Sequence, residues 1–177
     1  MSTIIYHGSV DIVKSPEIRL VTRPLDFGIG FYASTIKERA EDWARKKAKK
    51  ANLTPIVNVY RLDMPALKEQ LDVKFFEHTS DDWLDFVLHH RKVAAYTIER
   101  SASGGRRLGM RQGIHHSYDM VMGEVADDDV FDAIELYESG IIVRDELMRR
   151  LKTKRLNDQV CFSTKKALKF LQFEKYY

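Results

Sequence analysis

The sequence predicts a single domain of the α+β class. A chain of 177 residues is long enough to bury one hydrophobic core, and its 44% hydrophobic and 31% charged residues are typical of an ordinary folded protein. Segments rich in β-branched and aromatic residues occur from the beginning of the chain to its end, and segments with helical periodicity lie between them. No repeat, low-complexity tract or convincing linker divides the chain, so we expect one domain over residues 1–177.

Alternating and β-branched residues predict the strands, and apolar residues three or four positions apart predict the helices. The expected strands are 3–9, 55–62, 73–76, 118–125 and 159–163. The expected helices are 35–50, 81–91, 128–139, 144–152 and 164–171. The segment 23–34 is expected to be a loop. Ser80 and Thr164 are expected to cap helix starts, and Gly140 is expected to end the helix before it.

The first helix carries a specific prediction about one aromatic residue. Thr35 and Glu38 have the spacing of a capping box, so Thr35 is expected at the N-cap. Trp43 belongs to an apolar stripe that should face inward. The members of that stripe are Ile36, Ala40, Trp43, Ala44 and Ala48.

The composition favours a reducing compartment and no membrane partner. No apolar run approaches the ~18–20 residues that a membrane span needs. The first ten residues lack the basic start and long apolar stretch of a signal peptide. Cys161 is the only cysteine, so it has no internal disulfide partner. We therefore expect a cytoplasmic protein.

The charge is unevenly distributed along the chain. The net charge of +3 is too small to argue for nucleic-acid binding by itself. Basic residues are concentrated in 37–50, 91–111 and 144–155, whereas the interval 112–143 has no Lys or Arg. The Gly-rich and basic segment 101–113 is expected to be a flexible surface loop.

Three functional motifs are present in outline but are not supported by their context. Gly28-Ile-Gly30-Phe-Tyr-Ala33 matches a dinucleotide fingerprint, but no strand precedes it and no helix follows at once. The histidine pairs at 89–90 and 115–116 point to different faces of a helix or strand, so we expect no metal site. Cys161 lies in an alternating apolar segment, which is typical of an unreactive core cysteine.

Two segments remain that folding alone explains less well. The first is Tyr6-His7-Gly8-Ser9, where a histidine and a glycine end a strand. The second is Gly28-Ile-Gly30-Phe-Tyr32, a two-glycine turn that presents a tyrosine. Glycines at such places let the backbone approach a ligand closely.

These segments resemble the catalytic domain of the poly(ADP-ribose) polymerase branch of the ADP-ribosyltransferases. That branch has His-Gly-Ser/Thr on its first strand, a Gly-x-Gly-x-Tyr turn and a second stacking aromatic on the next helix. Trp43 follows Tyr32 by eleven residues, at the place of that second aromatic. Over nearly its full length the chain looks like a bacterial family of uncharacterised domains in the same clan. The shared motifs are Arg-Pro-Leu-Asp-Phe-Gly-x-Gly-Phe-Tyr, Tyr118-Asp-x-Val-x-Gly-x-Val-Ala and Gln159-Val-Cys-Phe-Ser-Thr164-x-x-Ala-Leu.

The resemblance implies a split antiparallel β-sheet core with flanking helices and an NAD-binding cleft. In that cleft His7, Tyr32 and a third residue are the catalytic residues, while Gly8, Ser9, Gly30 and Trp43 bind the cofactor. The third residue of the family is usually Glu. Gln159 is the candidate here and Asp158 the alternative.

The same resemblance implies how NAD⁺ would be held and used as co-substrate. The nicotinamide would lie against Tyr32 and Trp43, its carboxamide would bond to the Gly8 backbone, and His7 would donate to a ribose hydroxyl. Cleavage of the nicotinamide–ribose bond creates an oxocarbenium-like centre, which a carboxylate stabilises better than an amide does. Gln159 therefore favours transfer of one ADP-ribose over polymer formation.

The expected function is NAD⁺-dependent mono-ADP-ribosyl transfer to a protein or nucleic acid. A bacterial toxin with a partner antitoxin protein fits the resemblance. One alternative is a degenerate module that binds NAD⁺ or ADP-ribose without reacting. Another is a nucleic-acid-binding domain, suggested by the basic segment 37–50 and by Arg106, Arg107 and Arg111.

Overall fold

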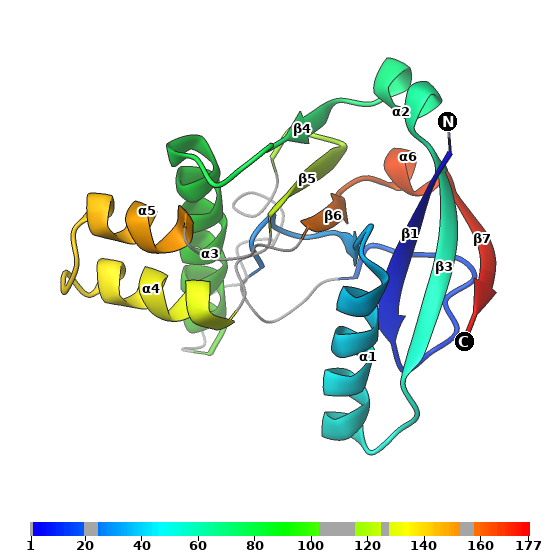
Figure 1. Cartoon of the computed structure of the whole chain (residues 1–177), viewed down its shortest axis with the longest axis horizontal. Helices are drawn as coiled ribbons and strands as arrows, with labels where there is room; N and C mark the ends of the chain where they lie inside the picture. Colours follow the sequence, from blue (N-terminus) through cyan, green and yellow to red (C-terminus); the bar gives the residue numbers. More distant parts are fainter. Residues whose placement is uncertain (1, 20–24, 103–115, 125–127, 153–157) are drawn as a thin grey trace.

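Two β-sheets and several helices make up the part of the chain that the computed structural model describes, which is residues 2–19, 25–102, 116–124, 128–152 and 158–177 (Figure 1). The strands are β1 Ser2–Ser9, β2 Phe31–Ala33, β3 Ile56–Asp63, β4 Val73–Phe75, β5 Met120–Glu124, β6 Asp158–Phe162 and β7 Leu171–Tyr176. The helices are α1 Lys37–Ala51, α2 Met64–Gln70, α3 Asp81–Ala102, α4 Asp128–Glu138, α5 Arg144–Lys152 and α6 Lys165–Leu168. The expectation of an α+β fold is confirmed.

One sheet is antiparallel and the other is mixed. The first sheet has the order β1-β3-β7, and both of its pairings are antiparallel. The second has the order β2-β6-β5-β4, in which β4 and β5 run parallel. The prediction of an antiparallel core is therefore wrong for this one pair. β4 and β5 can run parallel because the long connection through α3 lets the chain cross over and return in the same direction.

A single bridge joins the two sheets within the described residues. Tyr6 of β1 donates its N–H to the carbonyl of Ser34 at 2.8 Å, and the Ser34 N–H donates to the Tyr6 carbonyl at 2.9 Å. Ser34 follows β2 directly. The end of β1 that carries His7 and Gly8 therefore lies where the two sheets meet.

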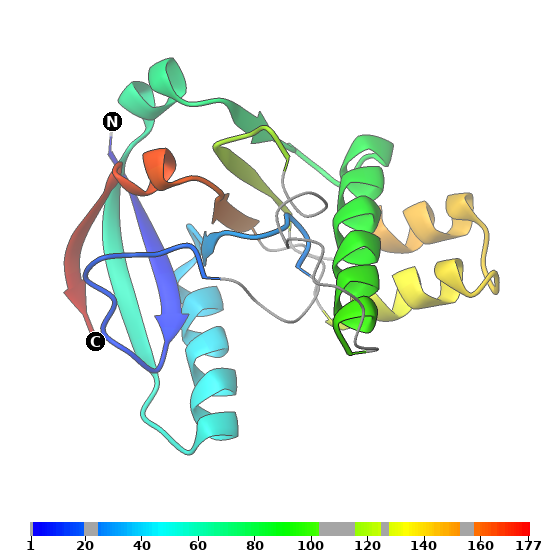
Figure 2. The same ribbon diagram turned by 180° about the vertical axis from the view of Figure 1, so that it is seen from behind.

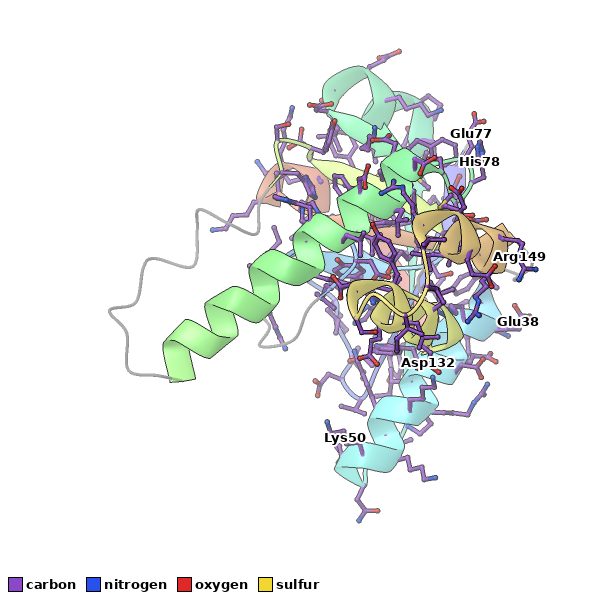
Figure 3. All side chains as sticks on the ribbon, turned by 90° about the vertical axis from the view of Figure 1, so that its left-hand side faces the viewer. Glu38, Lys50, Glu77, His78, Asp132 and Arg149 are labelled. Carbon is purple, nitrogen blue, oxygen red and sulfur yellow. The ribbon has the colours of Figure 1, made fainter. Side chains whose placement is uncertain are left out.

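Helix α1 packs closely on the first sheet through small side chains. Ala40, Ala44 and Ala48 are buried against Val57, with Tyr6 packed beside them. Lys50 lies at the far end of this helix, away from the sheet junction (Figure 3). The narrow alanine stripe brings the helix axis near the sheet, because nothing larger than a methyl group separates them.

Trp43 is not on the inner face of α1, so that prediction is wrong. Its side chain is 37% exposed. It precedes Ala44 by one position, which places it about 100° around the helix from the buried stripe. The stripe consists of alanines alone because a tryptophan would not fit in so narrow a gap.

The predicted capping by Thr35 is also wrong. The residue at the N-cap is Ile36, which has no side-chain capping bond. Ser34 Oγ accepts the Ile36 N–H at 3.0 Å, and the Asp158 carboxylate accepts the Thr35 N–H at 2.9 Å. The start of α1 is thus fixed from strand β6, across the junction.

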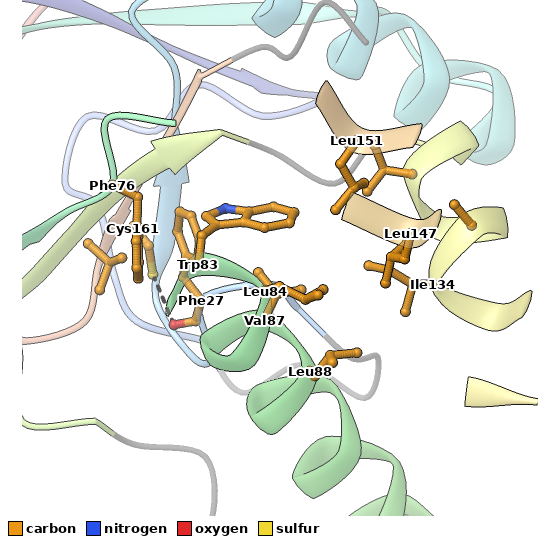
Figure 4. Close-up of a cluster of buried hydrophobic side chains, with 13 residues drawn as sticks. Phe27, Phe76, Trp83, Leu84, Val87, Leu88, Ile134, Leu147, Leu151 and Cys161 are labelled. Carbon is orange, nitrogen blue, oxygen red and sulfur yellow. Dashed lines mark hydrogen bonds between the residues drawn. The ribbon is translucent and has the colours of Figure 1, made fainter. Parts of the chain in front are cut away.

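The remaining helices cover the other end of the molecule. Helix α3 packs against the second sheet, and α4 and α5 form a hairpin on its outer side (Figures 1 and 2). Their buried side chains form one cluster with Phe27, Phe76 and Cys161 (Figure 4). Trp83 lies within it, with no exposed surface, and donates its indole N–H to the Glu124 carbonyl at 2.9 Å.

Several local predictions are confirmed and three elements were missed. Ser80 Oγ accepts the Trp83 N–H, Thr164 Oγ1 accepts the Ala167 N–H, and Gly140 has a φ of +75° after α4. The loop predicted at 23–34 contains β2, and α2 was not predicted. The closing helix was expected to reach residue 171, but α6 ends at Leu168 and β7 follows. Most of the loop predicted at 101–113 lies outside the described residues.

Replacing one buried leucine by alanine tests how strongly the α4–α5 hairpin is held. Leu147 of α5 is fully buried in the cluster, so Leu147→Ala should lower the free energy of unfolding by about 2–4 kcal/mol. Leu53 is 58% exposed, and the matched change Leu53→Ala should cost less than about 0.5 kcal/mol. Urea denaturation measures both, and equal effects would contradict the described packing.

Candidate functional site

The backbone of Gly8 presents both of its polar groups at an open strand edge. In the β1–β3 register Gly8 lies opposite Val57. The Val57 N–H and carbonyl are both bonded to Tyr177, at 2.9 and 3.1 Å, on the side away from β1. Gly8 and Val57 are therefore a non-hydrogen-bonded pair, and the Gly8 N–H and C=O point out of the other edge of β1.

The absence of a side chain at Gly8 is required by packing against α1. A Cβ atom there would lie 2.1 Å from the Ala40 carbonyl oxygen and 2.8 Å from the Ala44 nitrogen. Both are backbone atoms and cannot turn away as a side chain can. The presence of glycine at this position is therefore explained by packing against α1, and it is not by itself evidence that a ligand approaches here.

Lys47 of α1 reaches the open edge of β1. Its ammonium group donates to the Gly8 carbonyl at 2.9 Å. The same ammonium lies 5.9 Å from the centre of the Trp43 ring, one turn earlier on the helix. Gly8, Lys47 and Trp43 are therefore neighbours, although neither the sequence pattern nor its apolar stripe pointed to Lys47.

His7 is held in one tautomer by the backbone of β2. Its Nδ1 lies 2.6 Å from the Tyr32 carbonyl oxygen, and only a protonated Nδ1 can bond to a carbonyl. Burial and the Lys47 charge lower the pKa of His7 to about 4, although the bond to Tyr32 opposes this. The ring is thus neutral near pH 7, and Nε2 carries a lone pair. In this state Nε2 would accept a hydrogen bond from a hydroxyl, whereas the resemblance implied that His7 donates one.

Tyr32 orders the glycine turn that precedes it. Its hydroxyl donates to the Gly28 carbonyl at 2.7 Å and accepts the Phe27 N–H at 3.2 Å. Burial raises the pKa of this hydroxyl well above its ordinary value, so it is un-ionised. The ring is partly buried against the cluster around Phe27 and Cys161. Tyr32 therefore has a structural role whether or not a ligand stacks on it.

Gln159 lies on the same face of the second sheet as Tyr32. Tyr32 pairs with Cys161 across β2 and β6, and Gln159 is two residues from Cys161, so the two side chains are diagonal neighbours. The Gln159 amide donates to Asp26 Oδ2 at 3.1 Å. Its oxygen is an acceptor that a hydroxyl can use.

Sequence reasoning missed the ion pair behind Gln159. Asp26 is buried, and Arg91 of α3 donates to its Oδ1 from both Nε and Nη2, at 2.9 and 2.6 Å. A buried pair of this kind holds its surroundings in place, because removing either partner leaves a desolvated charge. The only sequence signal was an acid immediately before the Phe27-Gly28 turn.

The Asp158 side chain bonds to residues of the sheet junction. Its carboxylate accepts the Ser34 hydroxyl at 2.5 Å as well as the Thr35 N–H. Neighbouring residues on a strand point to opposite faces, so Asp158 and Gln159 diverge. This geometry favours Gln159 over Asp158 as the third site residue.

The other two predicted contacts are used by the protein itself. Ser9 Oγ accepts the Asp11 N–H at 3.2 Å just beyond β1. A Cβ on Gly30 would lie 2.4 Å from Cys161 Sγ and 2.7 Å from the Phe162 carbonyl oxygen, so this glycine is also needed for packing. Burial raises the pKa of the Cys161 thiol to about 11, which fits the prediction of a core cysteine.

A cavity of about 390 Å³ lies between the start of α1 and the ends of β4, β5 and β6. Gln159 and Asp158 line it together with Glu77 and Glu124. Its carboxylates make it more suitable for a cationic or neutral polar group than for a phosphate. His7 and Trp43 are not among its lining residues.

Metal and membrane features were searched for in the described part of the chain. There, His, Cys, Asp and Glu side chains do not gather in threes or more in an arrangement that could hold a metal ion. None of the described helices combines the length and apolarity that a membrane crossing requires.

The geometry defines an α+β domain whose histidine and open glycine edge meet at a sheet junction. Over residues 3–173 the chain matches the family described as "Protein of unknown function (DUF3990)". This match covers most of the chain, so the protein belongs to that family. No curated protein and no solved structure gives a significant match.

Substituting Asp158 and Gln159 in turn separates their roles. Asp158→Ala leaves the Thr35 N–H and the Ser34 hydroxyl without their acceptor, and should lower the free energy of unfolding by about 1.5–3 kcal/mol. Gln159→Ala should cost less than about 1 kcal/mol, because Asp26 keeps its bonds to Arg91. Thermal and urea unfolding of both variants measures the difference, and a larger loss for Gln159→Ala would contradict these assignments.

The lowered pKa values of two histidines predict an acid-sensitive fold. His7 and His90 have pKa values of about 4 in the folded protein, against 6.5 when unfolded. Between these values the unfolded chain binds protons that the folded protein does not, so stability is lost as the pH falls from about 6.5 to 4. His7 alone should account for about 3 kcal/mol over this range.

Unfolding in urea at pH 7, 6, 5 and 4 checks this. His7→Gln should show a shallower decline than the parent protein. A variant with the same decline as the parent would show that His7 is not held neutral.

Proposed function

We propose that this protein is an NAD⁺-dependent mono-ADP-ribosyltransferase. The observation that carries the proposal is the state of His7, which is neutral, fixed in one tautomer and located beside the open edge of Gly8. A neutral imidazole with a free lone pair at Nε2 suits a ribose hydroxyl. An adjacent backbone N–H and C=O suit a primary carboxamide, which has one acceptor and two donors. The resemblance of the His7-Gly8-Ser9 and Gly28–Tyr32 segments to ADP-ribosyltransferases supports the same reading.

In the proposed reaction the bond between the nicotinamide nitrogen and the ribose carbon breaks. The bonding electrons leave with the nicotinamide, which departs neutral, and an acceptor nucleophile forms the new bond to the ribose carbon and loses its proton. His7 and Gln159 each orient a hydroxyl of the ribose, and Gln159 does so through its amide oxygen. Because Gln159 carries no charge, the developing positive charge is stabilised by dipoles, by Asp26, whose charge Arg91 opposes, and by the carboxylates that line the cavity together with Gln159.

The acceptor in this proposal is a macromolecule, either a protein or a nucleic acid. The protein would act as a toxin inside a bacterial cell, and a partner antitoxin would neutralise it. The acceptor, the toxin role and the antitoxin are implied by the family resemblance. The geometry supports the proposed NAD⁺ site.

A binding module that holds NAD⁺ or ADP-ribose without reacting is the second candidate. The observation that favours it is the bond from the Gln159 amide to Asp26, which fixes an uncharged side chain where a carboxylate is usual in the resembled family. Such a site would retain affinity and lose rate, since binding a ribose hydroxyl and stabilising a cation are separate tasks. A nucleic-acid-binding domain has less support, because the acids Glu41 and Asp42 pair with Arg45 and reduce the positive charge of α1. Arg106, Arg107 and Arg111 lie outside the described residues.

Incubation with labelled NAD⁺ tests the proposal directly. Pure protein, NAD⁺ labelled in the adenylate phosphate and a bacterial lysate should give label on a macromolecule and release one nicotinamide for each ADP-ribose transferred. His7→Ala, Tyr32→Ala and Gln159→Ala should each reduce transfer by at least about 100-fold, because each misplaces the ribose or the nicotinamide. Leu53→Ala, which changes an exposed side chain, should keep the parental rate.

Three outcomes decide between the candidates. Transfer at parental rates by His7→Ala and Gln159→Ala variants that melt like the parent would overturn the site. NAD⁺ binding by calorimetry without nicotinamide release would favour the binding module. If the parent protein neither binds NAD⁺ nor releases nicotinamide from it, both candidates are ruled out.

A further inference from the structure

Lys47 already bonds to the Gly8 carbonyl, the acceptor that the proposed function assigns to the nicotinamide carboxamide. Its ammonium donates to the Gly8 carbonyl at 2.9 Å. Gly8 is buried as a residue, and at the edge where its carbonyl points one donor already bonds to the oxygen. An incoming carboxamide must therefore share the carbonyl with a full positive charge or displace it.

Sharing the carbonyl is electrostatically unfavourable. The N–H side of a carboxamide is the positive end of its dipole, and it would approach the ammonium that already bonds to the same oxygen. The nicotinamide ring of NAD⁺ adds a formal positive charge, which increases the repulsion at short range. Displacement of Lys47 is the better solution when the ligand offers the ammonium another partner.

Intact NAD⁺ offers such a partner and free nicotinamide does not. The pyrophosphate of NAD⁺ carries two negative charges a short distance from the nicotinamide ribose. A lysine has a flexible four-carbon stem, so its ammonium can move while its backbone stays in α1. Nicotinamide alone is neutral and has no anion with which to draw the ammonium away from Gly8.

We propose that Lys47 is a specificity-determining residue that selects the intact dinucleotide over free nicotinamide. This inference rests on the proposed function. The ammonium holds the Gly8 carbonyl in the empty site and moves to the pyrophosphate when NAD⁺ enters. When the ADP-ribosyl product leaves with its pyrophosphate, the ammonium returns to Gly8 and disfavours rebinding of free nicotinamide, which limits inhibition by this product. Trp43, beside the same ammonium, provides a ring face that keeps the lysine near the site in both positions.

The test compares the affinities of a matched set of variants for nicotinamide and for ADP-ribose, the two parts of NAD⁺. Calorimetry measures the binding of nicotinamide and of ADP-ribose to the parent protein, Lys47→Met, Lys47→Arg and Lys50→Met. Lys47→Met should bind nicotinamide roughly tenfold more tightly and ADP-ribose roughly tenfold more weakly, because a charge pair of ordinary strength is lost and the Gly8 carbonyl is freed. Lys47→Arg keeps the charge, so it should bind ADP-ribose within about threefold of the parent.

Lys50→Met is the matched control. Lys50 is an exposed lysine at the end of the same helix, about one turn beyond Lys47, and its loss should change neither affinity by more than about twofold (Figure 3). Thermal melting of every variant shows whether it is folded. If Lys47→Met does not fold, Lys47→Gln replaces it; its amide keeps a neutral donor for Gly8, so ADP-ribose should still bind roughly tenfold more weakly while nicotinamide binds at least as tightly as to the parent.

Opposite changes in the two affinities support the inference, because general damage to the site would weaken both ligands. Lys47→Met with parental affinity for both ligands, or with both weakened together, overturns it while the proposed function stands. A parent protein that binds neither ADP-ribose nor NAD⁺ overturns the proposed function, and the role of Lys47 falls with it.

Discussion

The close approach of α1 to the end of β1 is the constraint on which the rest of the site depends. At Gly8 the helix backbone lies so near that even a methyl group would overlap with the Ala40 carbonyl. This distance restricts the buried stripe of α1 to alanines and turns Trp43 outward. It also brings Lys47 within hydrogen-bonding distance of the Gly8 carbonyl, and the Lys47 charge in turn helps to keep His7 neutral. One steric requirement therefore sets the positions of Gly8, Trp43 and Lys47 and, through the Lys47 charge, influences the protonation state of His7.

The sheet junction is the second determinant, where polar contacts add to an apolar cluster in which Ile5 and Tyr60 of the first sheet pack with Phe31 of the second. The backbone bridge between Tyr6 and Ser34 is reinforced by Asp158, which binds both the Ser34 hydroxyl and the Thr35 N–H. His7 adds a bond from β1 to the Tyr32 carbonyl. Three strands thus converge on the turn before α1. A shift of β6 relative to β2 would move Asp158 and Gln159 together, so the position of α1 and the identity of the third site residue are coupled.

Local patterns were enough to predict most elements but not the contacts between them. The β-branched start of the chain, the cap at Ser80 and the glycine after α4 are properties of short segments, and the sequence predicts each of them correctly. Strands β2 and β7 are short or end the chain, and they exist because β6 and β3 offer edges to pair with. The bond between Gln159 and Asp26 joins residues 133 positions apart, and no periodicity reports such a contact. Trp43 was misplaced for a related reason, because the width of the buried stripe depends on Gly8 of another element.

The charges around the proposed site favour binding of NAD⁺ more than they favour stabilisation of the transition state. His7 is neutral, Gln159 is an amide, and the buried carboxylate behind it is opposed by the Arg91 guanidinium. A positive centre forming on a ribose would meet oriented dipoles, while the two carboxylates beside Gln159 are already engaged, Asp26 with Arg91 and Asp158 with the Ser34 hydroxyl. Dipoles fixed by a rigid ion pair need no reorganisation during the reaction, which recovers part of the lost stabilisation. The same arrangement disfavours removal of a proton from a ribose hydroxyl, since neither an amide nor an imidazole of such low pKa is an effective base near pH 7. Within the proposed function, these groups therefore favour transfer of a single ADP-ribose to an acceptor that is already nucleophilic.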